Sequence, residues 1–155
     1  MRDGLVAAFG LVAADPTISH VLLCGDGEAF CAGGDLDEFG SFPDPASAHL
    51  LRLQQSAGRA IEAVRERVVA HLHGACVGSG IELPAFAATV VAAPSTRISL
   101  PEVSLGLVPG AGGTVSLPRR IGRHRTARLV LAGETIDAST ALAWGLVDEV
   151  APPSR

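Results

Sequence analysis

The sequence is short of aromatic and charged residues and has no long apolar run. Of its 155 residues, 4% are aromatic, 18% are charged and 48% are hydrophobic. So few charges beside so much apolar surface exclude a disordered chain, and the excess of small aliphatic residues favours closely packed layers of helix on sheet. No apolar stretch reaches the roughly 20 residues that a membrane-spanning helix needs.

An excess of positive charge is also missing. The formal net charge is −4, which gives no electrostatic basis for binding nucleic acid or an anionic membrane. Residues 5–14 are apolar, as in a signal peptide, but Asp3 cancels the positive start and the stretch also fits an amphipathic helix. We therefore expect a cytoplasmic protein that binds neither nucleic acid nor membrane.

Cysteines are few and odd in number. Cys24, Cys31 and Cys76 stand in apolar or glycine-rich surroundings, which fits reduced thiols better than a disulfide framework. No base stands beside Cys31 or Cys76 in the sequence, so a cysteine nucleophile is disfavoured. His71 and His73 share a strand face but lack a third ligand at metal-binding spacing. We expect core or edge histidines and no metal site.

Strand-like and helical patterns alternate along the chain, which predicts α/β layers in a single domain of residues 1–155. Helices are expected over residues 3–14, 46–67, 110–122, 123–132 and 138–144. Asp137 should cap the last helix and Gly145 should end it. Strands are expected over residues 20–24, 68–73, 89–93, 97–100 and 146–150, and the first of them should be buried. The break at 41–45 should be mobile.

The stretch 74–84 reads Gly-Ala-Cys-Val-Gly-Ser-Gly-Ile-Glu-Leu-Pro. Its setting predicts a strand, a glycine-rich turn and then a helix whose first turn tolerates Pro84. The N–H groups at such a helix start favour an anion or a developing oxyanion. Because Glu82 would repel a phosphate, the pattern favours enolate chemistry. The alternative is that the glycines only allow a close strand-to-helix crossing.

Three further stretches, together with this turn, resemble the crotonase (enoyl-CoA hydratase/isomerase) superfamily in that family's order. They are residues 29–36, 100–114 and 133–147, and the resemblance runs from about Leu5 to Val150. It implies an α/β, crotonase-like spiral of ββα units with helices packed on a sheet. We expect one core domain without the family's N-terminal strands and C-terminal helical region, assembled as a homotrimer or hexamer.

The resemblance implies an enzyme that acts on acyl-CoA thioesters through two backbone N–H groups, which stabilise a thioester enolate. By similarity the donors are Gly34 and Ser79. Serine replaces the family's usual glycine at position 79, and it would be strained if that position required a positive φ. Ala32 is expected to contact the CoA adenine, with Asp35 and Gly78 also in the substrate-binding region and Asp35 ordering its loop. Coenzyme A is part of the substrate, so no separate cofactor is expected.

Glu82 and Glu102 match the pair of glutamates in the family's hydratases. The resemblance implies that Glu82 takes a proton from water while Glu102 supplies one to the α-carbon, so that water adds to a 2-enoyl-CoA. A double-bond isomerase of the same superfamily, or a catalytically weak acyl-CoA-binding or assembly subunit, are the open alternatives. Without the resemblance, Glu102 after Pro101 would be taken for a helix cap or a surface carboxylate.

Gly112 and Gly113 form a second glycine-rich stretch. They do not make a phosphate-binding loop, because no Gly-Lys-Ser/Thr follows them. We expect them instead to let the following helix approach the acyl pocket.

Overall fold

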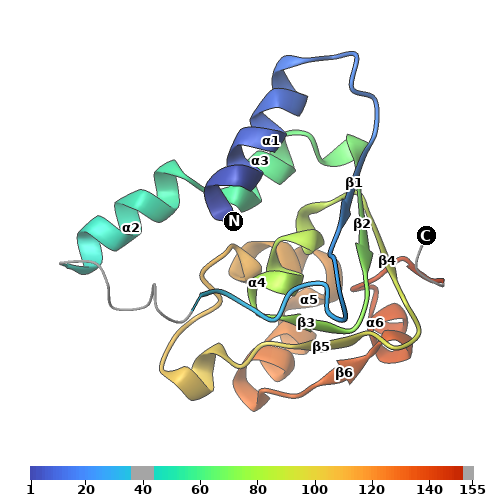
Figure 1. Ribbon diagram of the computed structural model, residues 1–155. Coiled ribbons are helices and arrows are strands. Elements are labelled where there is room, and N and C mark those ends of the chain that lie inside the picture. The colour runs from blue at the N-terminus through green and yellow to red at the C-terminus, as the bar shows by residue number, and fades with distance from the viewer. Residues whose placement is uncertain (36–43, 152–155) are drawn as a thin grey trace.

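Two small sheets form the centre of the molecule. The computed structural model describes residues 1–35 and 44–151, apart from the side chains of residues 45, 48, 49, 51 and 52. The first sheet is parallel, in the order β1-β2-β4-β7 (Val21–Cys24, Val68–Leu72, Thr89–Ala92, Glu149–Val150). The second has the order β3-β5-β6 (Ala75–Val77, Arg97–Ser99, Ile136–Asp137), with only β6 antiparallel to its neighbour. In Figure 1, β1, β2 and β4 run roughly vertically, whereas β3, β5 and β6 run roughly horizontally.

From β2 to β5, successive strands alternate between the two sheets. The chain leaves β2, turns at Gly74 (φ 55°) and enters β3 in the other sheet, and β4 and β5 repeat this change. Helical segments follow each strand pair: α4 (Ser79–Glu82) and η3 (Pro84–Phe86), then η4 (Glu102–Leu105) and α5 (Gly113–Ala132). This is the spiral of ββα units that the resemblance implies.

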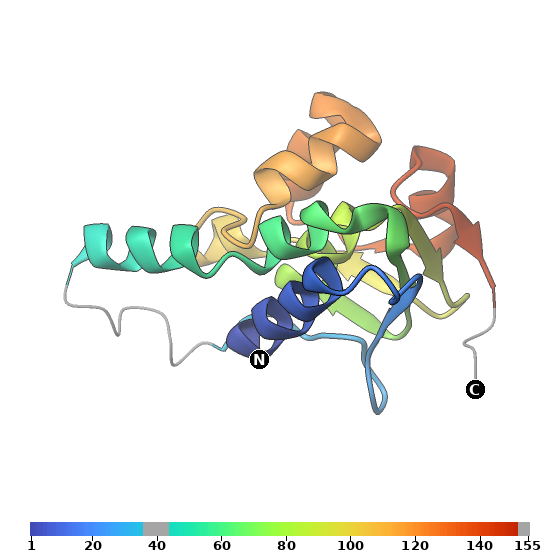
Figure 2. The same ribbon diagram turned by 90° about the horizontal axis from the view of Figure 1, so that it is seen from above.

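The region predicted as one helix over 46–67 is divided, so that prediction is wrong. It forms α2 (Pro45–Gln54), α3 (Ala57–Ala63) and the turn η2 (Arg65–Arg67). Ser56 causes the break, because its backbone is extended and its hydroxyl accepts a hydrogen bond from the Arg59 N–H at 3.3 Å, which starts a new helix. α1 (Arg2–Ala14) packs against α3, whereas α2 extends away from the sheets (Figure 2). The break expected at 41–45 falls mainly outside the described residues.

The later helices follow the sequence pattern closely. α5 is interrupted at Gly122 (φ 75°, ψ 164°), at the predicted junction between 110–122 and 123–132. α6 (Ala138–Trp144) is capped as expected, since the Asp137 carboxylate accepts from the Thr140 N–H at 2.8 Å and Gly145 (φ 82°) ends the helix. The strand predicted over 146–150 is reduced to the two residues of β7.

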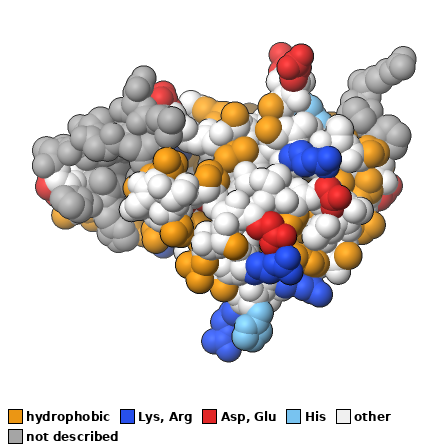
Figure 3. All heavy atoms as spheres, turned by 90° about the horizontal axis from the view of Figure 1, so that it is seen from below, with side chains coloured by type: hydrophobic (Ala, Val, Ile, Leu, Met, Phe, Trp, Pro, Cys, Tyr) orange, Lys and Arg blue, Asp and Glu red, His pale blue; other side chains and the backbone are white. Residues whose placement is uncertain are grey.

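The core lies between the sheets and the helices, around fully buried aliphatic side chains such as Ile61, Leu72, Ile81, Ile98 and Leu117. β1 was expected to be buried, but one of its faces is open and Leu22 is 54% exposed. On the face seen from below, hydrophobic atoms lie among charged side chains of both signs (Figure 3). Within the described ranges, no helix combines the length and the apolar character that crossing a membrane requires.

Candidate active site

Glu82 is a buried carboxylate held by the backbone of another segment. It ends α4 and is 2% exposed. Its Oε2 accepts hydrogen bonds from the N–H groups of Ala111 at 2.8 Å and Gly113 at 2.7 Å. A Cβ on Gly113 would lie 2.6 Å from Glu82 Cγ, so this position has no room for a side chain. The start of α5 therefore fixes the carboxylate of Glu82.

Glu102 lies over the turn that precedes α4. Its Oε1 is 2.5 Å from the place where a Cβ on Gly78 would stand, and its Oε2 is buried with no hydrogen-bond partner among the described residues. Gly78 has a φ of 54°, so the backbone conformation and the nearby carboxylate both require glycine. The Gly78 N–H donates to Ser99 O at 3.0 Å, which joins the turn to β5, the strand that leads to Glu102.

The two carboxyl groups lie close enough for one charge to affect the other. The pKa of Glu82 is raised to about 7, mainly by burial and also by the charge of Glu102, against the opposing effect of the Gly113 N–H. Burial also raises the pKa of Glu102. Near neutral pH such a pair can hold a proton on one carboxyl while the other is ionised, as acid–base catalysis requires.

The loop that carries Gly34 runs beside the turn that carries Ser79. The carbonyl oxygen of Cys31 accepts from the Val77 N–H at 2.9 Å, and a Cβ on Gly80 would be only 2.5 Å from the same oxygen. Throughout residues 1–35 and 44–151, neither the Gly34 N–H nor the Ser79 N–H donates a hydrogen bond to the backbone. The fold thus brings together two loops, each with an N–H group that bonds to no backbone acceptor in the described part of the chain.

The positive φ that was considered for position 79 falls on Gly78 instead. Ser79 is the first residue of α4, and only glycines have a positive φ among the described residues. The serine side chain therefore causes no backbone strain. A helix follows the turn as predicted, but Pro84 does not lie in its first turn, because α4 ends at Glu82 and Pro84, which has no N–H for an α-helical bond, begins the 3₁₀ turn η3.

The other predicted substrate-binding residues fall in two places. Ala32 and Asp35 are exposed on the loop near Gly34, while Gly78 is buried beneath Glu102. Sequence reasoning missed the N–H donors of residues 111 and 113, and Ser116, whose hydroxyl donates to Glu82 O at 2.8 Å.

The glycine pair at 112–113 was the sequence feature that could have revealed these donors. It was expected only to let a helix approach the acyl pocket. A Cβ on Gly112 would lie 2.6 Å from the ring of Phe86, and one on Gly113 would meet Glu82. The glycines therefore bring α5 against α4 and η3, and the close contact that they permit positions Glu82.

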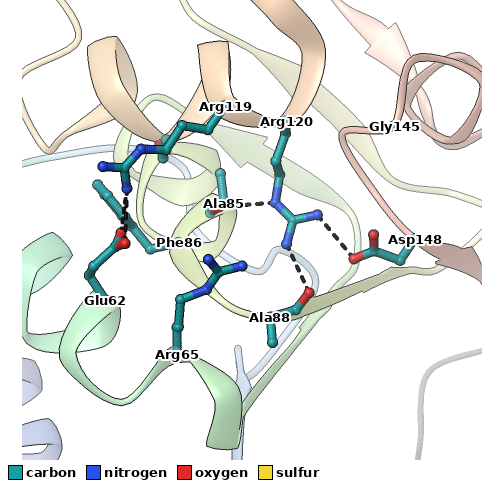
Figure 4. Close-up of a pocket in the computed structure, with 10 residues that line it drawn as sticks. Glu62, Arg65, Ala85, Phe86, Ala88, Arg119, Arg120, Gly145 and Asp148 are labelled. Carbon is teal, nitrogen blue, oxygen red and sulfur yellow. Dashed lines mark hydrogen bonds and ion pairs between the residues drawn. The ribbon is translucent and has the colours of Figure 1, made fainter.

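A cavity of about 510 Å³ lies between α3, η3 and α5 and includes neither Glu82 nor Glu102 (Figure 4). Arg120 at its edge donates to Ala85 O at 2.9 Å, to Ala87 O at 2.6 Å and to Asp148 Oδ2 at 3.0 Å. Arg119 pairs with Glu62 at 2.9 Å. The bonds from Arg120 tie α5 to η3, the turn that follows the Glu82 segment.

The described residues contain no group of three or more His, Cys, Asp and Glu side chains that could hold a metal ion. His73 behaves as an edge histidine, with Nε2 3.1 Å from Gly27 O and its ring edge-on to Phe30.

The two-sheet spiral and the glutamate pair define a protein of the crotonase fold, and solved structures agree. The chain superposes on the enoyl-CoA hydratase of Thermoplasma volcanium GSS1 with a TM-score of 0.88 at 36% identity, covering 99% of this chain and 61% of that one. The family model for enoyl-CoA hydratase/isomerase matches residues 1–155. The chain therefore belongs to the enoyl-CoA hydratase/isomerase family.

Relatives in this family include proteins of different length. The 2,3-dehydroadipyl-CoA hydratase of Escherichia coli (strain K12) is 36% identical over 148 residues, which cover 96% of this chain and 57% of that protein. The peroxisomal bifunctional enzyme of Danio rerio is 39% identical over 137 residues, or 88% of this chain and 18% of that protein. The chain thus spans less than two thirds of the length of these relatives.

Proposed function

We propose that this chain is the catalytic core of an enoyl-CoA hydratase, which adds water to the double bond of a 2-enoyl-CoA thioester. The observation that carries this proposal is the pair of glutamates that meet at one glycine-rich turn, the buried Glu82 on α4 and the half-buried Glu102 of η4 over Gly78. The family and the hydratase relatives support the same reaction class.

The proposed reaction requires one proton to leave water and another to reach carbon. Glu82 takes a proton from the water as its oxygen bonds to the β-carbon. The electron pair of the double bond moves toward the thioester, whose oxygen becomes negative, and the Gly34 and Ser79 N–H groups stabilise this enolate. Glu102 then gives its proton to the α-carbon. Each proton transfer contributes roughly 10²–10⁴-fold to the rate, and each oxyanion donor roughly 10²–10³-fold.

The hydrogen bonds support this division of roles. Glu82 Oε2 accepts two N–H groups, and such bonds favour the ionised form that a base needs. Glu102 Oε2 is buried and receives no bond from the described residues, which favours the protonated form that an acid needs. Because the pKa of Glu82 is raised to about 7, both of its forms are populated at neutral pH, and the two N–H groups stabilise the ionised form that takes the proton from water.

The proposal extends to the substrate and the assembly. The exposed loop with Ala32 and Asp35 would contact the CoA part, which brings the thioester to Gly34 and Ser79. No cofactor is needed beyond the coenzyme A of the substrate itself. By the family resemblance we propose a homotrimer or hexamer as the working assembly.

The test is a panel of 2-enoyl-CoA and 3-enoyl-CoA esters, with the products identified by mass. A hydratase gives products heavier by one water from the 2-enoyl esters. A 3-enoyl ester that keeps its mass but gains the absorbance of a conjugated enoyl thioester would replace the proposal with an isomerase. Binding without turnover by a folded sample would replace it with an acyl-CoA-binding or assembly subunit.

A further inference from the structure

Cys31 and Cys76 face each other across an isolated parallel bridge between the Gly34 loop and β3. The bridge consists of the bonds from Cys31 N–H to Ala75 O at 3.2 Å and from Val77 N–H to Cys31 O at 2.9 Å. Facing residues on neighbouring strands lie about 4.8 Å apart, with side chains on the same side. Disulfides join Cα atoms about 4.4–6.8 Å apart, so this backbone spacing suits one.

The two thiols differ in their access to solvent. Both are free, but Cys31 is partly exposed whereas Cys76 is completely buried. Burial raises the pKa of the Cys76 thiol to about 12, and the neighbouring Cys31 adds to this effect. A small oxidant therefore meets Cys31 first, because exposure and thiolate character decide which cysteine reacts.

We propose that Cys31 and Cys76 form a reversible disulfide in response to hydroperoxides. The sulfur of Cys31 attacks one peroxide oxygen and the O–O bond breaks, which leaves a sulfenic acid on Cys31 and releases hydroxide, which leaves as water with the thiol proton. The sulfur of Cys76 then displaces the hydroxyl group of the sulfenic acid, and that group leaves as water with the Cys76 proton. Two thiols are oxidised, and hydrogen peroxide is reduced to two waters.

A rotation of the side chains must precede the second step. The Sγ of Cys31 points to Gly33 O at 3.6 Å and that of Cys76 to His73 O at 3.8 Å, in both cases a weak hydrogen bond. Turning both sulfurs toward each other exchanges these two contacts for one covalent bond. Both cysteines belong to one chain and their backbones are already paired, so the disulfide step is intramolecular. This proximity favours the disulfide over further oxidation of Cys31.

The position of the pair connects it to catalysis. Cys31 lies three residues before Gly34, and Cys76 lies three residues before Ser79. A disulfide draws the two Cβ atoms to about 3.8 Å and so pulls one loop against the other. A misplacement of about 1 Å at a reacting site can reduce the rate about 10²-fold. This consequence for activity rests on the proposed function, whereas formation of the disulfide does not.

The chemical test treats the 155-residue chain with a small excess of hydrogen peroxide at neutral pH, followed by thiol alkylation, intact mass and peptide mapping. We expect a loss of two hydrogens, one cross-linked peptide pair containing residues 31 and 76, and full reversal by dithiothreitol. Cys24→Ser should behave like the parent, because Cys24 lies elsewhere on β1, and Cys31→Ser should form no cross-link. Addition of oxygen to Cys31 while Cys76 stays alkylatable after unfolding would overturn the proposal.

The activity test compares each variant with itself before and after oxidation. For the parent and Cys24→Ser we expect hydration of crotonyl-CoA to fall tenfold to a hundredfold and to recover with dithiothreitol. Cys31→Ser and Cys76→Ala should lose far less activity. Cross-linking without any change of rate overturns the regulatory role, whereas an inactive but folded reduced parent that still cross-links overturns only the proposed hydratase function.

Discussion

Glu82 rests directly on the backbone of Gly113, with its Oε2 2.7 Å from the Gly113 nitrogen and its Cγ only 2.6 Å from where a Cβ of residue 113 would stand. This contact joins α4 to the start of α5 and orients a carboxylate that is 2% exposed. The orientation of the proposed base therefore depends on a residue that has no side chain.

Replacing Gly113 with alanine tests this dependence. In Gly113→Ala the new methyl group must displace Glu82, so we expect a loss of about 1–3 kcal/mol in the free energy of unfolding and about a 10²-fold fall in the hydration rate. Gly10→Ala in α1 is the matched control, because its Cβ would have no atom within 4 Å. The control should be about 0.5–1 kcal/mol more stable than the parent. A Gly113→Ala variant with parental stability and rate would contradict the role of Gly113.

The raised pKa of Glu82 predicts a pH-dependent stability. The folded chain holds the Glu82 proton up to about pH 7, whereas the unfolded chain releases it near the ordinary value of 4.5. The contribution of Glu82 to the free energy of unfolding is thus complete below about pH 4.5. It is lost as the pH rises through about 7, by up to roughly 3 kcal/mol. Urea unfolding of the parent and Glu82→Gln at several pH values measures it. As the pH rises, the free energy of unfolding of the parent should fall relative to that of Glu82→Gln. A difference between the two that stays constant would refute the raised pKa.

A proline at position 79 would remove the backbone N–H of this residue with little other change to the helix. Proline is tolerated at the first residue of a helix, where its missing N–H has no helical partner, and Ser79 holds that position in α4. We expect Ser79→Pro to lower kcat by about 10²–10³-fold, while Ser79→Ala, which keeps the N–H, stays within a few-fold of the parent. Circular dichroism checks the fold of both. Equal rates for the two variants would exclude the Ser79 N–H as an oxyanion donor.

Two adjacent arginines should differ in their effect on stability. The side chain of Arg120 is 12% exposed and binds several carbonyl oxygens at the end of η3, whereas that of Arg119 is 60% exposed and pairs with Glu62. Arg120→Ala leaves buried acceptors unsatisfied, and we expect a cost of about 2–4 kcal/mol. Arg119→Ala should cost at most about 1 kcal/mol. Urea unfolding of both variants gives the comparison, and similar costs would contradict the role of Arg120 in supporting η3.

Features encoded by neighbouring residues could be predicted from the sequence. Asp137 and Gly145 bound α6 as expected, because a cap depends on residues within one helical turn. The glutamates were recognised through the family resemblance, and the structure places both at the same turn.

Features that depend on distant contacts could not be predicted. β3 and β6 are three and two residues long, too short to show an alternating pattern, and the partners in their sheet define them as strands. Without β3, the pairing of Cys31 with Cys76 stays hidden. The break at Ser56 was missed because apolar residues continue at helical spacing across it. The N–H groups that hold Glu82 come from the backbone, which leaves no signature in side-chain chemistry.

Hydration of crotonyl-CoA, followed as loss of the conjugated enoyl absorbance, tests the central claim most directly when the parent is compared with Glu82→Gln and Glu102→Gln. We predict turnover by the parent and a fall of about 10²-fold or more in each folded variant, because each loses one proton transfer. A folded parent that hydrates no 2-enoyl-CoA, or a Glu102→Gln variant as fast as the parent, would contradict the account.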